Sequence, residues 1–196
     1  MSHPSRRDLI HAALAAGGAG LTGGAALAQE LPLTPQCDDG GPGTIQQTEG
    51  PFFRARSPDR ENLVEAGSKA RQVELTGFVL TRGCNPLARV VVDLWHADEK
   101  GAYDSKGFRY RGRVYTDEKG RYRIRTIQPA LYPGRTRHYH AKVAAGGRLV
   151  LTTQLYFPDE PGNNRDGLFR KELLMRMSKS GDALAARFDF VVDLKV

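Results

Sequence analysis

The sequence predicts an all-β fold: a β-sandwich with an extended N-terminal arm and little helix. Many short runs of apolar residues, alternating or continuous, are separated by turn-forming residues, which is typical of strands in a sandwich. Only residues 167–177 carry apolar side chains at helical spacing, so we expect one helix there. A length of 196 residues suits one such domain, and no internal repeat is present.

The expected strands lie after residue 70, in a domain covering 71–196. In chain order they cover residues 72–80, 88–95, 108–115, 122–126, 138–144, 148–157 and 188–196. The first and last alternate apolar and other residues, while the second is a dense apolar run typical of a buried strand. The sequences DEKG at 117–120 and AGG at 145–147 are suitable hairpin turns between neighbouring strands.

Two further segments precede this domain. Residues 1–28 have paired arginines, Arg6 and Arg7, followed by a Gly/Ala-rich apolar run and an A-x-A sequence at 26–28. This pattern predicts a cleaved, twin-arginine-like export signal, with a Sec signal as the alternative, and therefore a periplasmic or secreted protein. After cleavage no segment is expected to span a membrane. Residues 29–70 are rich in Pro, Gly and polar residues, and we expect them to form an arm over the core.

Charge and cysteine content indicate which binding partners and which covalent links to expect. The chain has a net charge of +7, and because the leader contributes +1, the remainder carries +6. The basic residues are scattered among acidic ones rather than clustered, which argues against nucleic-acid binding. In an oxidising compartment Cys37 and Cys84 are expected to form an intramolecular disulfide; two free buried thiols are the alternative.

The residues best suited to catalysis or metal binding lie in the segment from Tyr132 to His140. His138 and His140 are two positions apart on an expected strand, so both point to one face and could bind one metal ion. Tyr132 lies just upstream, and Tyr103 lies in a loop after the second strand. Phenolates are hard anionic oxygens that favour a high-charge ion such as Fe(III). Spacing alone also allows a structural histidine pair, or a copper or zinc site.

An ordered set of motifs narrows these alternatives. It comprises TEGPFF at 48–53, DLWHAD at 93–98, GAY at 101–103, RGR at 111–113, TDEKGRY at 116–122, TIQPALYP at 126–133, HYH at 138–140 and TQLYF at 153–157. Each motif is weak by itself, but their order closely resembles the intradiol ring-cleavage dioxygenases, which act on catechol, hydroxyquinol or protocatechuate. The resemblance covers residues 48–157 and implies a β-sandwich of the intradiol dioxygenase or prealbumin-like type.

The resemblance also implies a cofactor and roles for particular residues. The cofactor is a mononuclear, non-haem Fe(III), with Tyr103, Tyr132, His138 and His140 as ligands. Arg135 matches the active-site arginine and Gln154 the active-site glutamine, while Tyr132 matches the ligand that is displaced and helps to accept a proton. The substrates are a small aromatic diol and O2, and the product is a cis,cis-muconate-type dicarboxylate. Family members commonly assemble, so a homo-oligomer is compatible with the resemblance. No NAD, flavin or nucleotide motif is present.

Some residues compete with these assignments or depart from the family pattern. Tyr110 rivals Tyr103 as a phenolate, and Arg137 rivals Arg135, but position favours Tyr103 and Arg135. His96 is expected either to support the metal ligands from behind or to have a structural role, rather than to bind the metal itself. Tyr139 and Ala141 replace the aliphatic residue and the phenylalanine usual in the family, and Tyr139 should pack on the opposite face of the strand from the histidines.

Two other functions remain open from the sequence. A non-catalytic prealbumin-like binding domain would account for the strands but not for the combination of Tyr132, Arg135 and the histidine pair. A copper or zinc β-sandwich enzyme would account for the histidine pair, although only three histidines lie outside the leader.

Overall fold

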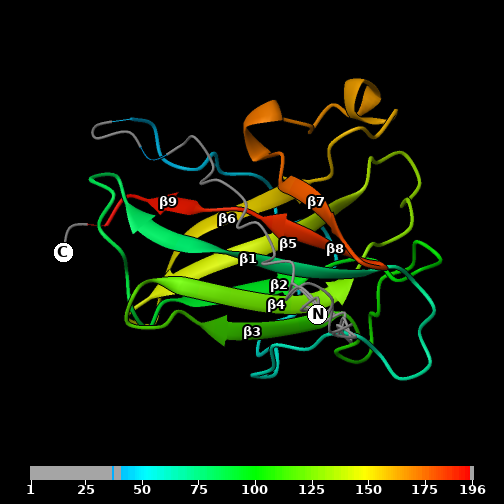
Figure 1. Cartoon of the computed structure of the whole chain (residues 1–196), viewed down its shortest axis with the longest axis horizontal. Helices are drawn as coiled ribbons and strands as arrows, with labels where there is room; N and C mark the ends of the chain where they lie inside the picture. Colours follow the sequence, from blue (N-terminus) through cyan, green and yellow to red (C-terminus); the bar gives the residue numbers. More distant parts are fainter. Residues whose placement is uncertain (1–36, 38–40, 195–196) are drawn as a thin grey trace, which may run out of the picture.

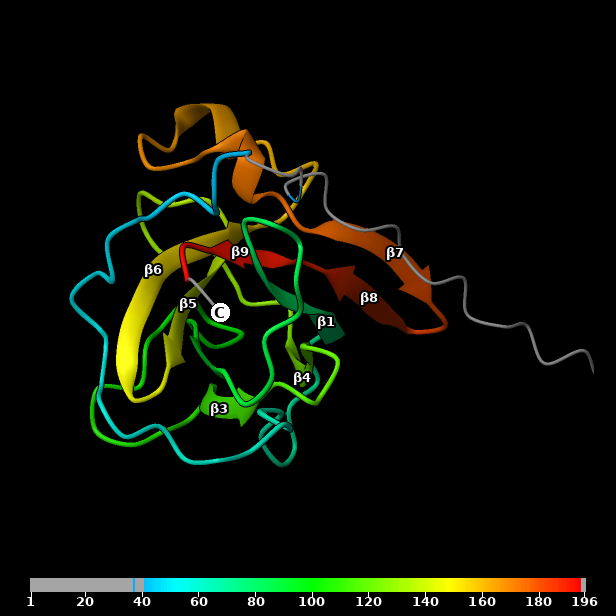
Figure 2. The same ribbon diagram turned by 90° about the vertical axis from the view of Figure 1, so that its left-hand side faces the viewer.

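A computed structural model describes Cys37 and residues 41–194. Two β-sheets face each other, with the loops that join their strands gathered at the ends and along the edges (Figures 1 and 2). This arrangement confirms the predicted all-β sandwich. The predicted leader at 1–28, and the arm up to residue 36, lie outside the described residues.

One sheet has five strands and is built around β1. Its path is β4-β1-β8-β7, and β9 pairs with the far end of β1. β1 is antiparallel to β4 and parallel to both β8 and β9. The strands are β1 (Gln72–Thr81), β4 (Arg121–Ile127), β7 (Arg176–Ser180), β8 (Ala183–Arg187) and β9 (Phe190–Val192).

The other sheet has four antiparallel strands in the order β3-β2-β5-β6. These are β2 (Val91–Trp95), β3 (Arg111–Tyr115), β5 (His138–Ala145) and β6 (Arg148–Tyr156). Strand β5 lies between β2 and β6, so both of its edges are paired. Its side chains therefore have well-defined neighbours on either side.

The hydrophobic core lies between the two sheets. From β5 the core includes Tyr139, Ala141 and Val143, all fully buried. Because successive residues of a strand point to opposite faces, His138 and His140 point away from this core. They are nevertheless buried, because loops and the arm cover the outer face of the sheet at this position.

The prediction of a helix at 167–177 was wrong. The segment instead contains one short 3₁₀ turn, Lys171–Leu173. Another 3₁₀ turn, Asn163–Arg165, lies just before the segment. The backbone nitrogen of Met175 donates to the carbonyl oxygen of Tyr156 at 2.9 Å. This N–H therefore bonds to the end of β6 rather than to a carbonyl four residues earlier, as it would in an α-helix. The apolar residues at helical spacing lie in an irregular segment: Leu173 is buried in the core, Leu174 and Met177 pack against it, and Leu168 is exposed. Strand β7 begins at Arg176.

The hairpin of β7 and β8 was not predicted. β7 is polar and mostly exposed at the edge of the sheet, and β8 is rich in alanine, so neither has the usual strand signature. Of the predicted strand at 188–196, residues 195 and 196 lie outside the described part of the chain, and within the rest only β9 is a strand. Before it, the Asp189 carboxylate accepts a hydrogen bond from the backbone nitrogen of Phe78, at the point where pairing with β1 passes from β8 to β9.

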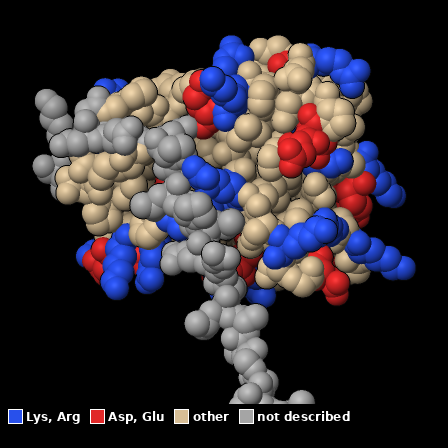
Figure 3. Space-filling view, turned by 45° about the horizontal axis from the view of Figure 1, so that its top comes forward, with Lys and Arg blue, Asp and Glu red and all other residues tan. Residues whose placement is uncertain are grey.

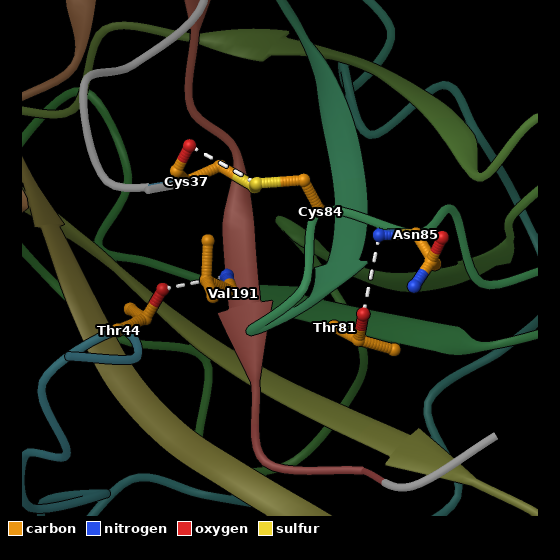
Figure 4. The surroundings of a disulfide bond; sticks show 6 residues. All are labelled: Cys37, Thr44, Thr81, Cys84, Asn85 and Val191. Carbon is orange, nitrogen blue, oxygen red and sulfur yellow. Dashed lines mark hydrogen bonds between the residues drawn. A yellow bond between two sulfur atoms is a disulfide. The ribbon is translucent and has the colours of Figure 1, made fainter. Parts of the chain in front are cut away.

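The predicted disulfide between Cys37 and Cys84 is confirmed, with 5.6 Å between the two Cα atoms (Figure 4). It joins the start of the described arm to the turn after β1. Seven residues further on, the Thr44 backbone and side chain both bond to the backbone of Val191 in β9, at 2.8 and 2.9 Å. The arm is thereby fixed to the five-stranded sheet before it crosses to the other one.

The surface carries mixed charge. On the face seen in Figure 3, lysines and arginines are interspersed with aspartates and glutamates. Within the described residues, no helix is long and apolar enough to cross a membrane.

Candidate metal centre

Strand β5 holds the two histidines at its start, on the outer face of the sheet and at the end where β2 and β6 finish. His140 lies between Trp95 on β2 and Gln154 on β6, and His138 lies opposite Tyr156 on β6. The two Nε2 atoms are 3.1 Å apart, as the two-residue spacing on one strand predicted.

The hydrogen bond made by His138 sets its tautomer. Nδ1 is 2.6 Å from the carbonyl oxygen of Thr136, and because a carbonyl can only accept, Nδ1 carries the proton. The Nε2 lone pair is therefore free and faces the site, as is usual for a metal-ligating histidine. Burial, together with the nearby Arg135 guanidinium, lowers the pKa of His138 to about 4. The imidazole is thus neutral at physiological pH.

His140 is held mainly by packing. Its ring stacks on Trp95, with centroids 5.0 Å apart, and its buried Nδ1 has no hydrogen-bond partner in the described part of the chain. Burial, reinforced by the neighbouring His138 and the guanidinium groups of Arg135 and Arg111, keeps the pKa of His140 well below its ordinary value. Both histidines are therefore neutral nitrogen donors.

Tyr103 completes a triangle of donor atoms. Its hydroxyl oxygen is 3.2 Å from Nε2 of His138 and 3.1 Å from Nε2 of His140. The loop that places it is closed by Asp98, whose carboxylate accepts hydrogen bonds from the backbone nitrogens of Lys100 and Ala102. Burial raises the pKa of the Tyr103 phenol. The phenol is therefore neutral unless a nearby cation favours its ionised form.

This triangle fits a metal ion. Ligands about 2.1 Å from an ion and at right angles to one another lie roughly 3 Å apart. With His140 protonated on Nδ1, both Nε2 atoms and the Tyr103 oxygen would offer lone pairs to one point, and a shared cation would satisfy all three. Among the described residues no three His, Cys, Asp or Glu side chains converge, so this candidate centre depends on a tyrosine.

Tyr132 lies beside the triangle but outside it. Its ring meets that of Tyr103 edge-on, with centroids 5.6 Å apart, and Phe52 packs against both tyrosines. No hydrogen bond links the Tyr132 hydroxyl to the three donor atoms among the described residues. The loops of the two tyrosines touch at Gly101: a Cβ there would lie 2.2 Å from the carbonyl oxygen of Leu131.

Arg135 and Gln154, both named as site residues from the sequence, lie near the histidines. Nη2 of Arg135 donates to Oε1 of Gln154 at 2.6 Å, and the amide nitrogen of Gln154 donates to the carbonyl oxygen of Thr48 in the arm. Oε1 of Gln154 also accepts from the hydroxyl of Tyr156 at 3.1 Å. A guanidinium is thereby directed at the side of the site where β5 and β6 meet.

The competing residues have other partners. Tyr110 donates to Glu99, and Arg137 pairs with Glu160. His96 lies 2.6 Å from the hydroxyl of Thr126 and 2.7 Å from the carbonyl oxygen of Ala97. Tyr139 faces the core, as expected, and donates to the carbonyl oxygen of Ile127 at 2.8 Å.

Asp166 was not among the predicted site residues. It is nearly buried, and its carboxylate accepts from Nε of Arg135 at 2.8 Å. It follows β6 in an irregular segment without a motif, so its position in the sequence gives no sign of this contact.

The chain is similar to known ring-cleaving enzymes. Residues 48–194 match the family model described as Dioxygenase. The beta chain of protocatechuate 3,4-dioxygenase from Burkholderia cepacia is 33% identical over 164 residues, which cover 67% of this chain and 69% of that protein. Hydroxyquinol 1,2-dioxygenase from Rhizobium sp. (strain MTP-10005) is 30% identical over 167 residues, covering 70% of this chain and 56% of that enzyme.

A solved structure agrees with the same assignment. It is the dioxygenase domain of a dioxygenase carbohydrate-binding protein fusion from Streptomyces sp. SirexAA-E. The match has 47% sequence identity and a TM-score of 0.76, and it covers 79% of this chain and all of that domain.

Proposed function

The chain belongs to the intradiol dioxygenase family, and we propose that it is a non-haem Fe(III) enzyme that cleaves the ring of a catechol-type diol with O2. Both oxygen atoms of O2 enter the product, a cis,cis-muconate-type dicarboxylate. Ring carbons that bear the two hydroxyl groups become the two carboxylates, so the atoms balance without an added reductant.

The observation that carries the proposal is the triangle formed by the Tyr103 hydroxyl and the two imidazole Nε2 atoms, with edges of 3.1 to 3.2 Å. Two neutral imidazoles and a phenolate favour a hard, high-charge ion, which in this family means Fe(III). We propose Tyr132 as the fourth ligand, since its ring borders the triangle. A bound ferric ion supplies Lewis acidity that lowers the pKa of the phenols and of a coordinated diol.

The remaining roles follow from charge and position. Within the described part of the chain Tyr132, unlike Tyr103, has no hydrogen bond to the histidines, so it is the tyrosine better able to move away, and as a phenolate it would take a proton from the incoming diol and become a neutral phenol. Arg135 stabilises negative charge as it develops on the substrate oxygens. Gln154 holds Arg135 in place and presents an amide to the same side of the site.

The test is a visible spectrum and metal analysis of the purified protein, with and without catechol under air. We expect about one iron per chain, a phenolate-to-iron absorption band that shifts on adding catechol, and then muconate absorbance with both atoms of labelled O2 incorporated. A protein that stays colourless after Fe(III) is supplied would favour the non-catalytic binding domain. Stoichiometric copper or zinc without tyrosine-dependent colour would favour the alternative metalloenzyme.

We also propose that the protein acts outside the cytoplasm, in the periplasm or as a secreted enzyme. The signal-like leader and the Cys37–Cys84 disulfide support this location, because structural disulfides persist in oxidising compartments. Mass spectrometry of the exported protein should give a chain starting at Gln29. An uncleaved chain retained in the cytoplasm would contradict the proposal. The native mass would decide whether the enzyme is a homo-oligomer.

A further inference from the structure

Asp166 makes four hydrogen bonds from a carboxylate whose side chain is 2% exposed. Oδ2 accepts from Nε of Arg135 at 2.8 Å and from the backbone nitrogen of Thr136 at 2.9 Å. Oδ1 accepts from the backbone nitrogen of Leu168 at 2.9 Å and, more weakly, from the same Nε at 3.1 Å. Although burial opposes ionisation, the hydrogen bonds from Leu168, Thr136 and Arg135 keep the pKa of Asp166 below its ordinary value. It is therefore an anion at neutral pH.

These contacts determine how Arg135 lies. A guanidinium is planar and its donors are fixed relative to one another. With Nε on Asp166 and Nη2 on Gln154, the plane and direction of the group are set. Nη1 has no hydrogen-bond partner within the described residues, so it is the donor left for a ligand. Gln154 lies opposite His140 in the β5–β6 register, so this guanidinium is held at the edge of the donor triangle.

We propose that Asp166 is a positioning residue of this site, which acts through Arg135 by holding its guanidinium toward the oxygens of the reacting diol. The inference rests on the proposed function and deepens it. A charged donor contributes most when it is already oriented toward the charge that develops during reaction. Without the carboxylate, Arg135 has free rotamers and the same charge reaches the substrate less often in the productive geometry.

The hydrogen bonds from the backbone of Thr136 and Leu168 to Asp166 would also be consistent with a purely structural role. A second ion pair in the chain offers a control for this alternative. Arg137 and Glu160 form a second ion pair between the same two segments, with 3.3 Å between Nε and Oε1 and side chains 21% and 16% exposed. Glu160→Gln removes a carboxylate that binds these segments together without touching Arg135. A loss of kcat in Asp166→Asn but not in Glu160→Gln would therefore show that losing an ion pair between these segments is not enough to slow turnover.

The experiment compares Asp166→Asn, Arg135→Met, their double variant and Glu160→Gln as iron-loaded enzymes. We expect Asp166→Asn to keep wild-type iron content and visible band, while kcat for catechol falls by roughly tenfold to a hundredfold and KM changes by less than about threefold. The double variant should be no slower than Arg135→Met alone, and Glu160→Gln should stay within about twofold of the wild type. A wild-type kcat in Asp166→Asn, or losses that multiply in the double variant, would overturn the inference.

Two further measurements keep the result decisive. If Asp166→Asn does not fold, Arg135→Lys replaces it, since this change keeps the charge but loses the Nε–H that Asp166 accepts. It should then lose nearly as much kcat as Arg135→Met, and full activity would contradict the positioning role. A double-mutant cycle in the urea midpoint of the metal-free protein should show that the two residues are coupled in the fold, independently of turnover. A wild-type chain that binds no iron refutes the proposed function itself, whereas a normal wild type with an unaffected Asp166→Asn refutes only this inference.

Discussion

The indole of Trp95 stacks on the imidazole of His140, with ring centroids 5.0 Å apart and ring planes 9° from parallel. The two residues are direct cross-strand partners on β2 and β5. His138 is oriented by a hydrogen bond to Thr136, whereas Nδ1 of His140 has no such partner among the described residues. The orientation of His140 therefore depends on an aromatic neighbour.

Trp95→Phe should weaken metal binding more than it disturbs the fold. The smaller ring leaves His140 freer to rotate, and losing an outer support of a metal ligand typically costs on the order of tenfold in affinity. Iron affinity is measured by competition with a chelator. Phe188→Leu is the control, because it also reduces a fully buried aromatic side chain but lies in the core between the sheets. Equal iron affinities in the two variants would show that the stack does not orient the ligand.

Gly101→Ala should separate the loops of the two tyrosines. Gly101 has φ of +82°, and its added Cβ would lie 2.2 Å from the carbonyl oxygen of Leu131, so one of the two loops must move. Gly67→Ala is a close control, since φ is +78° there and no atom lies within 4 Å of the added Cβ. Both variants carry the backbone strain of a left-handed residue, roughly 1 kcal/mol. Only Gly101→Ala should also lose the tyrosine-to-iron band, and an unchanged spectrum would contradict this link.

His96 should make the protein less stable in mild acid. Its pKa is lowered to about 4 by burial, against an ordinary value near 6.5. Between these two pH values the unfolded chain binds a proton at this site that the folded chain does not, so the free energy of unfolding falls as pH falls through this window. The contribution is on the order of 3 kcal/mol across the window.

The comparison is between the wild type and His96→Gln, both metal-free, with unfolding free energies measured by urea from pH 4 to 7. The free energy of unfolding of the variant should depend less steeply on pH. In the middle of the window the difference corresponds to about one proton fewer taken up on unfolding. The pKa values of His138 and His140 are also lowered, mainly by burial, and both histidines are present in both proteins. Parallel curves would mean that His96 is not a buried neutral histidine.

The disulfide should stabilise the arm that covers the site. It closes a loop of 47 residues between Cys37 and Cys84, for which the chain-entropy relation gives about 4 kcal/mol. Beyond Thr44 the arm continues to Thr48, whose carbonyl accepts from Gln154, and to Phe52 on Tyr103. The double variant Cys37→Ser/Cys84→Ser should unfold at lower urea, and reducing the wild type should have the same effect. Equal midpoints with and without reductant would show that the hydrogen bonds alone hold the arm.

The strands that bury one face were predictable, because alternation on β1 and β5 follows directly from the pleat. The same rule placed His138 and His140 together and Tyr139 in the core. Other features depend on contacts that no local pattern encodes. The β7–β8 hairpin is polar and alanine-rich, and its place is set by the parallel pairing of β8 with β1, more than a hundred residues away in sequence. No local pattern pointed to Asp166 for a similar reason, since its ion-pair partner is Arg135, 31 residues before it.

Replacing the donor atoms one at a time should separate metal binding from folding. His138→Gln removes the imidazole whose lone pair faces the site, and Tyr103→Phe removes the hydroxyl that lies 3.1 to 3.2 Å from both histidines. We expect His138→Gln to lose stoichiometric iron, because two donors of the triangle cannot replace three. Tyr103→Phe should bind iron more weakly and lose much of the visible band, since the band arises from phenolate. His96→Gln, a change to a buried histidine outside the triangle, should keep both iron and colour. Iron content and visible spectra are measured on the same preparations of each variant. A His138→Gln variant with full iron content and wild-type turnover would rule out this triangle as the metal centre.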